Sequence, residues 1–244
     1  MKIAVFGSSG RMGMEVCRAV SNEPDLELIA GIDVGDSKDA ALGADVAVDF
    51  THPDSVLDNI SWCVQHGISM VVGTTGFTPE RLDLVRAMQG DDPRVGVLIA
   101  PNFAIGAVLM MYFSKVAAPY FESVEIIEAH HTGKADAPSG TAANTARMVA
   151  EAREQAGAGA MPDATTHQVD GARGAAISDV HVHSVRLPGL IAQQEVRLAS
   201  SGETLTIVND ARSRSCYMPG VLRGIRWVTT HPGLTVGLEP VLGI

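Results

Sequence analysis

The stretch KIAVFGSSGRMG, residues 2–13, decides the fold of the first part of the chain. Its apolar run ends at a turn with three glycines, Gly7, Gly10 and Gly13. Glycine permits a tight turn, close approach of the backbone to a pyrophosphate, and close packing of a helix on the preceding strand. The free N–H groups at the start of that helix attract an anion. The stretch therefore predicts a strand, a nucleotide-binding turn and a helix. The candidate cofactor-binding residues of the turn are Gly7, Ser8, Ser9, Gly10, Arg11 and Met12.

An acidic residue further along supports this interpretation. Asp33 lies 20 residues beyond Gly13, directly after the apolar run LELIAGI at residues 26–32. A carboxylate in that position accepts hydrogen bonds from the hydroxyls of an adenosine ribose. The glycine spacing, G-x-x-G-x-x-G, departs from the usual G-x-G-x-x-G, so a glycine turn that binds no nucleotide stays open as the alternative.

Strand-like and helix-like segments alternate through the first hundred residues. Apolar runs occur at residues 2–6, 26–32, 46–50, 69–72 and 95–99. Thr78-Pro79-Glu80 offers an N-cap, a first-turn proline and a first-turn acid, and Gly90 follows the expected end of that helix. A second expected helix begins at Pro53 and ends near Gly67. Continuous apolar runs that alternate with helices predict an α/β fold with a Rossmann-type, doubly wound parallel sheet.

The pattern changes after about residue 104. A long apolar helix is expected first, then an alternating strand, a second helix and a long loop, at residues 105–118, 123–130, 140–155 and 157–178. Three strand-like runs follow at residues 180–187, 190–198 and 203–208. Successive strands without helices between them predict a second α+β domain with a mixed or antiparallel sheet. The chain is expected to return to the first domain just after Arg214, which gives domains of residues 1–104 with 215–244, and of residues 105–214.

Composition excludes several classes of protein. The 244 residues have a net charge of −10, and 46% are apolar against 19% charged, which excludes a disordered tail protein. A pI near 5.2 argues against a nucleic-acid partner, because such binding depends on clustered Lys and Arg. Three cysteines without a C-x-x-C pair argue against a disulfide scaffold or a zinc ribbon and fit a reducing compartment. Cys17 and Cys63 fall in expected helices, where we expect both to be buried.

We expect a cytoplasmic protein with no targeting segment. One uncharged stretch, residues 95–113, approaches the length of a membrane span. Pro101 and Asn102 interrupt it. A buried strand followed by a buried helix is therefore the expectation for this stretch, with no membrane partner.

Two further loops follow expected strands, at the sheet edge where open α/β sheets bind ligands. The first is Gly73-Thr74-Thr75-Gly76, and the second is Ala100-Pro101-Asn102-Phe103. Their small residues and backbone amides suit a nicotinamide pocket lined by Gly73, Thr74, Thr75, Ala100, Pro101, Asn102 and Phe103. Ordinary connecting loops are the alternative.

The segment EAHHTGKADAPSGTA, residues 128–142, concentrates groups that bind anions and move protons. His130 can donate a proton near neutral pH, Lys134 can hold a carboxylate, and the amides of Gly140 and Thr141 at a helix start can hold another. Adjacent histidines on a strand point to opposite faces, so His130 and His131 are a poor metal-chelating pair, and we expect no metal. The segment suits a small dicarboxylate that needs a proton. Histidines satisfied by backbone carbonyls and a solvated lysine are the alternative.

A second pair of histidines, His181 and His183, alternates along an expected strand and shares one face. This spacing is that of a metal-ligand pair. No third ligand is within sequence reach, so packing or surface roles are expected.

Together these motifs resemble the dihydrodipicolinate reductase family of bacterial lysine and diaminopimelate biosynthesis, in its actinobacterial branch. The family's G-x-x-G-R-M-G turn corresponds to residues 7–13, and its G-T-T-G and A-P-N-F loops to residues 73–76 and 100–103. Its most specific signature, E-x-H-H-x-x-K-x-D-A-P-S-G-T-A, is complete at residues 128–142. The closing segment VGLEPVLGI also resembles that branch, and the resemblance covers essentially the whole chain.

The resemblance implies an oxidoreductase that uses NADH or NADPH to reduce 4-hydroxy-tetrahydrodipicolinate to tetrahydrodipicolinate. It implies that His130 donates a proton, that Lys134 is catalytic, and that His131, Gly140 and Thr141 bind the dicarboxylate substrate. It also implies domain closure over the substrate and a homotetramer built on the sheet of the second domain, residues 105–214. The chain departs from many members at Thr132-Gly133, where they carry a further basic or imidazole group, and at Ser8-Ser9, where some carry a lysine.

A rival hypothesis is a nucleotide-sensing binding protein with a Rossmann domain, a dimerising sheet and no turnover. His130 and Lys134 beside a helix start favour the enzyme, because a sensor needs no proton donor.

Overall fold

The computed structural model describes all residues, 1–244, and divides them into two compact units. Unit 1 comprises Met1–Ile105 and Arg214–Ile244, and unit 2 comprises Gly106–Ser213. The two boundaries between the units, after Ile105 and after Ser213, each lie one residue from the boundaries expected from the sequence, which are after residues 104 and 214.

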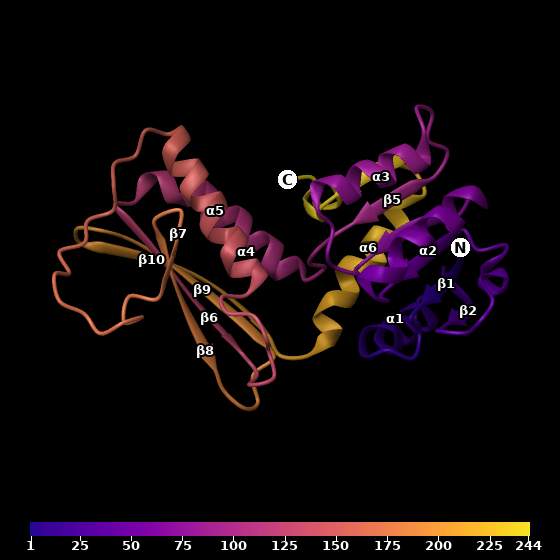
Figure 1. The fold of residues 1–244 in the computed structure, drawn as a ribbon, viewed down its shortest axis with the longest axis horizontal. Coiled ribbons are helices and arrows are strands. Elements are labelled where there is room, and N and C mark those ends of the chain that lie inside the picture. Colours follow the sequence, from indigo (N-terminus) through magenta and orange to yellow (C-terminus); the bar gives the residue numbers. More distant parts are fainter. The chain divides into compact units, whose positions relative to one another are not determined.

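Unit 1 contains a six-stranded, fully parallel sheet (Figure 1). Its strands are β1 (Lys2–Phe6), β2 (Glu27–Ile32), β3 (Val46–Asp49), β4 (Ser69–Val72), β5 (Gly96–Ile99) and β11 (Gly233–Val236). The strand order is β11-β5-β4-β3-β1-β2, so the chain reverses its direction of travel across the sheet beside β1. Strand order that reverses at this point defines the crevice in which doubly wound sheets bind ligands, and the glycine turn lies at its edge. The predicted Rossmann-type fold is confirmed. The closing strand β11 was not anticipated.

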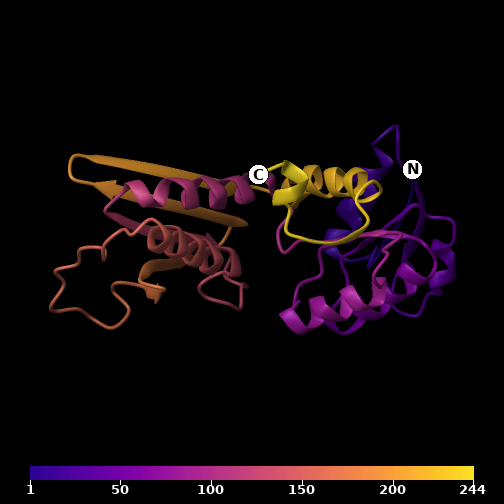
Figure 2. The same cartoon turned by 90° about the horizontal axis from the view of Figure 1, so that it is seen from above.

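Helices cover both faces of this sheet. They are α1 (Arg11–Ser21), α2 (Pro53–Gln65), α3 (Pro79–Gln89), α6 (Met218–Val228) and the short α7 (Glu239–Leu242), with 3₁₀ turns at Lys38–Ala41 and Arg214–Tyr217. α1 and α6 pack together on one face, and α2 and α3 on the other (Figure 2). The expected signals delimit α3, because the Thr78 hydroxyl accepts a hydrogen bond from the Arg81 amide and Gly90 ends the helix at a φ of 69°.

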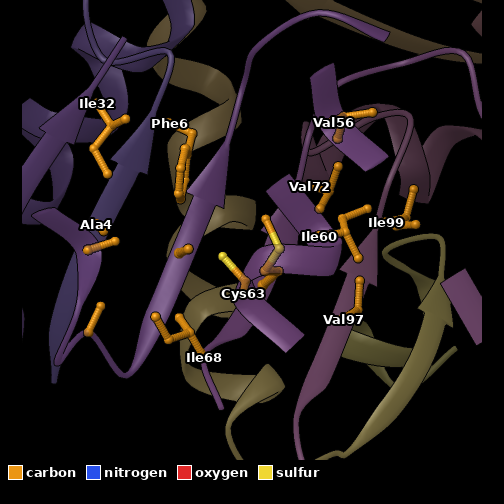
Figure 3. Close-up of a cluster of buried hydrophobic side chains, with 14 of the residues drawn as sticks. Ala4, Phe6, Ile32, Val56, Ile60, Cys63, Ile68, Val72, Val97 and Ile99 are labelled. Carbon is orange, nitrogen blue, oxygen red and sulfur yellow. The ribbon is translucent and has the colours of Figure 1, made fainter. Parts of the chain in front are cut away.

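The core of unit 1 explains why its strands have continuous apolar sequences. All residues of β3, β4 and β5 are buried, as expected for a sheet with both faces covered. Figure 3 shows one side of this core, where Val56, Ile60 and Cys63 of α2 meet side chains from the strands. Cys63 is buried as expected. Cys17 is only half-buried, because it lies beside the buried stripe of α1 rather than within it.

Unit 2 contains a five-stranded mixed sheet of order β10-β9-β6-β8-β7, which confirms the predicted second α+β fold. Its strands are β6 (Ser123–His130), β7 (Ala175–Ile177), β8 (Val180–Arg186), β9 (Ala192–Ser200) and β10 (Glu203–Ala211). The strand β7 was also not anticipated: it lies inside the expected loop at residues 157–178 and pairs with β8. Short edge strands of this kind depend on their partner rather than on their own sequence.

Two helices lie on one side of this sheet, α4 (Ile105–Ala117), followed by a 3₁₀ turn at Ala118–Tyr120, and α5 (Gly140–Gln155) (Figures 1 and 2). Side chains alternate across the sheet, so Val124, Ile126 and Glu128 of β6 face the helices and are buried. The residues between them, Glu125 and Ile127, are only half-buried on the other face.

The uncharged stretch at residues 95–113 forms β5, a loop and most of α4. A strand followed by a helix is therefore the correct interpretation of it. No helix of the structure has both the length and the apolar character that a membrane crossing requires.

Candidate functional site

The glycine turn of unit 1 has a geometry that requires glycine at two positions. Gly7 has a φ of +78°, and a Cβ placed on Gly13 would lie 1.9 Å from the Gly7 carbonyl oxygen. Gly10 precedes α1 as its N-cap and has no side chain with which to cap it. The amides of the first helical turn therefore meet no capping side chain, which is the arrangement that receives an anion at a helix start. These residues fit the phosphates of a dinucleotide.

Asp33, directly after β2, is tied to this turn. Its Oδ2 accepts hydrogen bonds from the hydroxyls of Ser8 and Ser9, both at 2.6 Å, and from the Ser9 amide at 3.0 Å. Hydrogen bonds from Ser8 and then Ser9 hold the pKa of Asp33 below its usual value. The carboxyl group is thus ionised at neutral pH and ready to accept from hydroxyl donors. Arg11 is exposed at the start of α1, and Met12 beside it is half-buried.

A buried carboxylate that was not predicted from the sequence holds the loop after β4 in place. Asp49 ends β3 and is fully buried. Its Oδ1 accepts from the Thr74 hydroxyl at 2.6 Å and from the Thr51 hydroxyl at 2.8 Å, and its Oδ2 accepts from Asn59 at 2.8 Å. The Thr74 hydroxyl also accepts from the Thr51 amide at 2.8 Å. The side chain of Thr74 is therefore occupied inside the unit, and its backbone is what remains for a ligand.

The loop after β5 likewise has some residues buried inside the unit and others accessible to a ligand. Ala100 and Phe103 are buried, and the Phe103 ring lies 6.0 Å from the ring of Phe50 between centroids. Pro101 is exposed, and Asn102 is half-buried with its Oδ1 accepting from the Ala104 amide at 2.9 Å. In the preceding loop, a Cβ on Gly73 would meet the ring of Phe50, and Thr75 is exposed.

In unit 2, β6 ends at His130, whose side chain is 14% exposed and lies against the fully buried carboxylate of Glu128. His130 Nδ1 and Glu128 Oε2 are 2.5 Å apart. Burial raises the pKa of Glu128, but hydrogen bonds from Arg186, Ser184 and His130 outweigh it and leave the pKa below its usual value. Burial lowers the pKa of His130, and the charges of Lys134 and Arg186 add to this, against the opposing effect of Glu128. The imidazole is therefore neutral in the ligand-free protein near neutral pH.

The same carboxylate organises the elements around it. Arg186, at the end of β8, donates to both Glu128 oxygens at 2.8 Å. The Ser139 amide donates to Glu128 Oε1 at 3.2 Å, and the Ser139 hydroxyl caps α5 by accepting from the Ala142 amide. Gly140 and Thr141 follow as the first residues of α5. Glu128 thus joins His130 to the start of the helix.

Lys134 follows in the loop after β6 and pairs with Asp136, with 2.7 Å between Nζ and Oδ1. This contact holds the pKa of Asp136 below its usual value. His131 lies beyond the end of β6 and is half-buried. The structure therefore gathers His130, Lys134 and the start of α5 around one loop of unit 2.

Neither Glu128 nor Arg186 was singled out from the sequence. Glu128 belongs to the 128–142 segment, where a buried acid beside a histidine is a recognisable signal. No sequence signal identifies Arg186, because its side chain reaches Glu128 only through the parallel pairing of β6 with β8.

His181 and His183 point away from this cluster. His183 Nε2 lies 2.8 Å from Glu125 Oε2, and His181 Nε2 lies 3.9 Å from Asp163. Arg173 pairs with both acids. No group of three or more His, Cys, Asp or Glu side chains has an arrangement that would hold a metal ion.

A Rossmann-type unit with a glycine turn, joined to a separate α+β unit with a histidine–lysine cluster, defines a nucleotide-dependent oxidoreductase of two domains. Family models for the N-terminus and the C-terminus of dihydrodipicolinate reductase match residues 1–103 and 106–242. The chain belongs to the dihydrodipicolinate reductase family, as its motifs predict.

Individual relatives agree along the whole chain. It is 58% identical to the 4-hydroxy-tetrahydrodipicolinate reductase of Thermobifida fusca over 245 residues, and 56% identical to that of Cutibacterium acnes over 244 residues. These alignments cover all of this chain and 100% and 99% of the two relatives. A dipicolinate-bound dihydrodipicolinate reductase from Paenisporosarcina sp. TG-14 superimposes with a TM-score of 0.88 at 36% identity, over 98% of each chain. The expected resemblance to actinobacterial members is confirmed.

Proposed function

We propose that this protein reduces (2S,4S)-4-hydroxy-2,3,4,5-tetrahydrodipicolinate, with loss of water, to tetrahydrodipicolinate, and that NADH or NADPH is the reductant. One observation carries the proposal beyond family membership. His130, Lys134 and the start of α5 lie together in unit 2 and offer a proton-transfer group, a cation and the backbone amides of a helix start. A dicarboxylate that must gain a proton needs these three groups.

The nucleotide belongs to unit 1 in this proposal, with Gly7 to Met12 at its phosphates and Asp33 at its adenosine ribose. The glycine turn, which admits no Cβ at Gly7 or Gly13, supports this assignment. The backbone of the loops at residues 73–75 and 100–103 would line the nicotinamide. When bound, the nicotinamide supplies a hydride, which the substrate receives at ring carbon C4.

The residues of unit 2 bind the dicarboxylate and provide the proton. Lys134 and His131 hold carboxylate oxygens, and the amides of Gly140 and Thr141 hold others with the favourable dipole of α5 behind them. The ion pair of Lys134 with Asp136 opens or is shared when the substrate carboxylate arrives. Water leaves first, as the C4 hydroxyl and a proton of the adjacent carbon, and a double bond forms between the two carbons. After C4 has received the hydride, the protonated His130 gives a proton to that adjacent carbon and returns to the neutral form. Lys134 also orients the substrate and is a second candidate proton donor.

The decisive assay measures NADH absorbance after the aspartate-semialdehyde/pyruvate condensation product is added to purified protein. We expect absorbance to decay only when protein, nucleotide and condensation product are all present. Nucleotide binding without decay would instead support the sensor. Pyridine-2,6-dicarboxylate should inhibit competitively with the substrate, because it presents two carboxylates at similar spacing, and its binding should weaken modestly with salt. Competition with NADH alone would assign the dicarboxylate to the other unit.

We further propose a cytoplasmic homotetramer assembled through the sheet of unit 2. The sheet face opposite α4 and α5 supports this, because Thr204, Thr206 and Val208 of β10 are exposed on it. Four copies in closed symmetry would have a mass of about 100 kDa, against 25.6 kDa for one chain. Light scattering on the eluted protein distinguishes these masses, and a mass of one chain would reject the tetramer.

A further inference from the structure

Glu128 is the most fully partnered acid of unit 2. Its side chain is completely buried, and its two oxygens are approached by different groups. His130 and one Arg186 nitrogen meet Oε2, at 2.5 and 2.8 Å. The Ser139 amide and the other Arg186 nitrogen meet Oε1, at 3.2 and 2.8 Å. One carboxylate therefore touches the proposed proton donor, a charge from another strand and the start of α5.

The contact between His130 Nδ1 and Glu128 Oε2 determines which ring nitrogen of His130 carries hydrogen. An ionised carboxylate only accepts hydrogen bonds, so Nδ1 of His130 must be the nitrogen that bears hydrogen. In the neutral imidazole, Nε2 is then left with a lone pair. A proton donor of this kind must first take up a proton at Nε2, and the buried negative charge of Glu128 stabilises the imidazolium that results.

Arg186 makes this arrangement rigid. Its guanidinium forms a two-pronged pair with Glu128 and also donates to the Asp136 carbonyl oxygen at 2.7 Å. Two parallel hydrogen bonds fix the plane of a carboxylate in a way that a single bond cannot. Arg186 thus sets the direction from which Glu128 meets His130, and it also holds the loop that contains Lys134.

We propose that Glu128, oriented by Arg186, is a positioning residue of the reductase: it fixes His130 with hydrogen on Nδ1 and with Nε2 free to take up the proton that the substrate receives. The same carboxylate holds Ser139, so it keeps the imidazole and the start of α5 in one fixed relation. This inference rests on the proposed function for its catalytic meaning. The state of the imidazole can be measured without turnover.

The groups that face His130 set the expected pH behaviour. Glu128 of β6 favours the imidazolium, whereas Arg186 of β8 and Lys134 of the following loop oppose it, and Asp136 partly offsets Lys134. Replacing Glu128 by glutamine removes the one group that touches the imidazole and favours its charged form. Its amide NH₂, placed toward His130, would also require Nδ1 to accept, which moves the hydrogen to Nε2.

The chain supplies a matched control on the opposite face of the same strand. Glu125 pairs with Arg173 and with His183, whose Nε2 lies 2.8 Å from Glu125 Oε2. Glu125→Gln therefore removes a carboxylate charge that lies beside a histidine ring, as Glu128→Gln does, but on the sheet face away from His130. It should alter the imidazole of His183 and leave that of His130 unchanged.

The experiment records ¹⁵N spectra of the histidine rings in ligand-free protein, with the signals of His130 assigned by their loss in His130→Gln. In the wild type we expect His130 to show hydrogen on Nδ1 and a bare Nε2 near pH 7.5. In Glu128→Gln we expect hydrogen on Nε2. The upper limb of the kcat/KM profile, where a general acid loses its proton, should move down by about 1–3 pH units.

Two results would overturn the proposal: hydrogen on Nε2 of His130 in the wild type, or unchanged tautomer and pH profile in a folded Glu128→Gln variant. A purely structural role would lower stability and leave both readouts in place. If Glu128→Gln does not fold, the wild-type spectrum still shows which nitrogen of His130 carries hydrogen. Arg186→Lys then tests whether Arg186 orients Glu128, because lysine keeps the positive charge and loses the bidentate pair. If no reduction is detected at all, the proposed function fails and the spectra still answer the question of the tautomer.

Discussion

The Thr74 hydroxyl donates a 2.6 Å hydrogen bond to the buried carboxylate of Asp49, which joins the loop after β4 to the end of β3. Neighbouring parallel strands end at the same edge of the sheet, so this bond fixes the shape of the edge where a nucleotide would lie. The side chain of Thr74 is thus engaged by Asp49, and we expect Thr74 to contact a nucleotide through its backbone, which Asp49 holds in position.

Asp49→Asn should weaken both the fold and nucleotide binding. The amide turns one acceptor into a donor, although Thr51, Thr74 and Asn59 all donate to this side chain. We expect the free energy of unfolding to fall by roughly 2 kcal/mol and the KM for NADH to rise. Urea unfolding and initial rates measure these effects. Asp45→Asn is the control, because Asp45 is exposed and its side chain accepts a hydrogen bond from the Lys2 amide, at 2.7 Å. Equal behaviour of the two variants would remove Asp49 from the support of the loop.

Lys134→Ala should reduce kcat/KM severely while NADH binding is retained. The ammonium acts as a point charge on a substrate carboxylate, and such charge-assisted contacts contribute roughly 1.5–3 kcal/mol each before any catalytic role. Steady-state kinetics and NADH titration separate the two effects. Lys115→Ala, on an exposed position of α4, is the control. Activity within about threefold of wild type would exclude Lys134 from the site.

His130→Gln tests the proton donor itself. Loss of a general acid should lower kcat by roughly 10²-fold or more. Glutamine can still donate a hydrogen bond to Glu128 through its amide, so the buried carboxylate keeps one partner and the fold should survive. Single-turnover measurement of NADH oxidation checks the chemical step. Unchanged turnover would assign the proton to solvent or to Lys134.

The pH dependence of the free energy of unfolding should show the contribution of the ionised Glu128 side chain to stability. Its pKa in the folded protein lies below that of the unfolded chain, because the hydrogen bonds from its partners outweigh burial. A carboxyl group of this kind stabilises the fold above its unfolded pKa of about 4.3, and that contribution is lost as pH falls through the folded pKa. Wild type should therefore lose more stability than Glu128→Gln between about pH 5 and pH 3. Parallel loss in the two proteins, measured by urea unfolding, would contradict this.

Local chemistry made several elements predictable from the sequence. The Thr78 cap, the proline after it and Gly90 delimit α3, and the expected helix at residues 140–155 coincides with α5. Continuous apolar runs identified the five consecutive strands of the first sheet. The signal is complete in β3, β4 and β5, where every residue is buried because helices cover both faces of the sheet. The signature at residues 128–142 predicted the loop that contains His130 and Lys134.

Features that depend on distant parts of the chain could not be predicted in this way. β7 and β11 are short, and each exists because a neighbouring strand pairs with it. Arg186 lies 58 residues from Glu128 in sequence, and only the register of β6 against β8 brings the two together. The inward orientation of the Thr74 side chain likewise follows from Asp49, on another strand.

Cofactor choice should follow from the surroundings of Asp33. Its ionised carboxylate can accept from two ribose hydroxyls of NADH but repels the extra phosphate of NADPH. Val34, Gly35 and Asp36 come after it, so no arginine directly follows the acid to hold that phosphate. Arg11 is exposed in the turn, and we expect its positive charge to offset part of this repulsion. We therefore expect both nucleotides to be used, with NADH preferred by no more than about tenfold, which is roughly 1.4 kcal/mol.

Two variants separate these contributions, and kcat/KM for each nucleotide measures them. Asp33→Ala should narrow the preference, because it removes the acceptor that NADH uses and the charge that NADPH avoids. Arg11→Ala should impair NADPH selectively. Ser8→Ala is a useful third variant, since it frees Asp33 Oδ2 from one 2.6 Å hydrogen bond without changing any charge. Its effect on the two nucleotides should be similar, because neither the attraction to ribose nor the repulsion of phosphate is lost. A strong wild-type preference for NADPH, or an unchanged ratio in Asp33→Ala, would show that Asp33 does not bind the ribose.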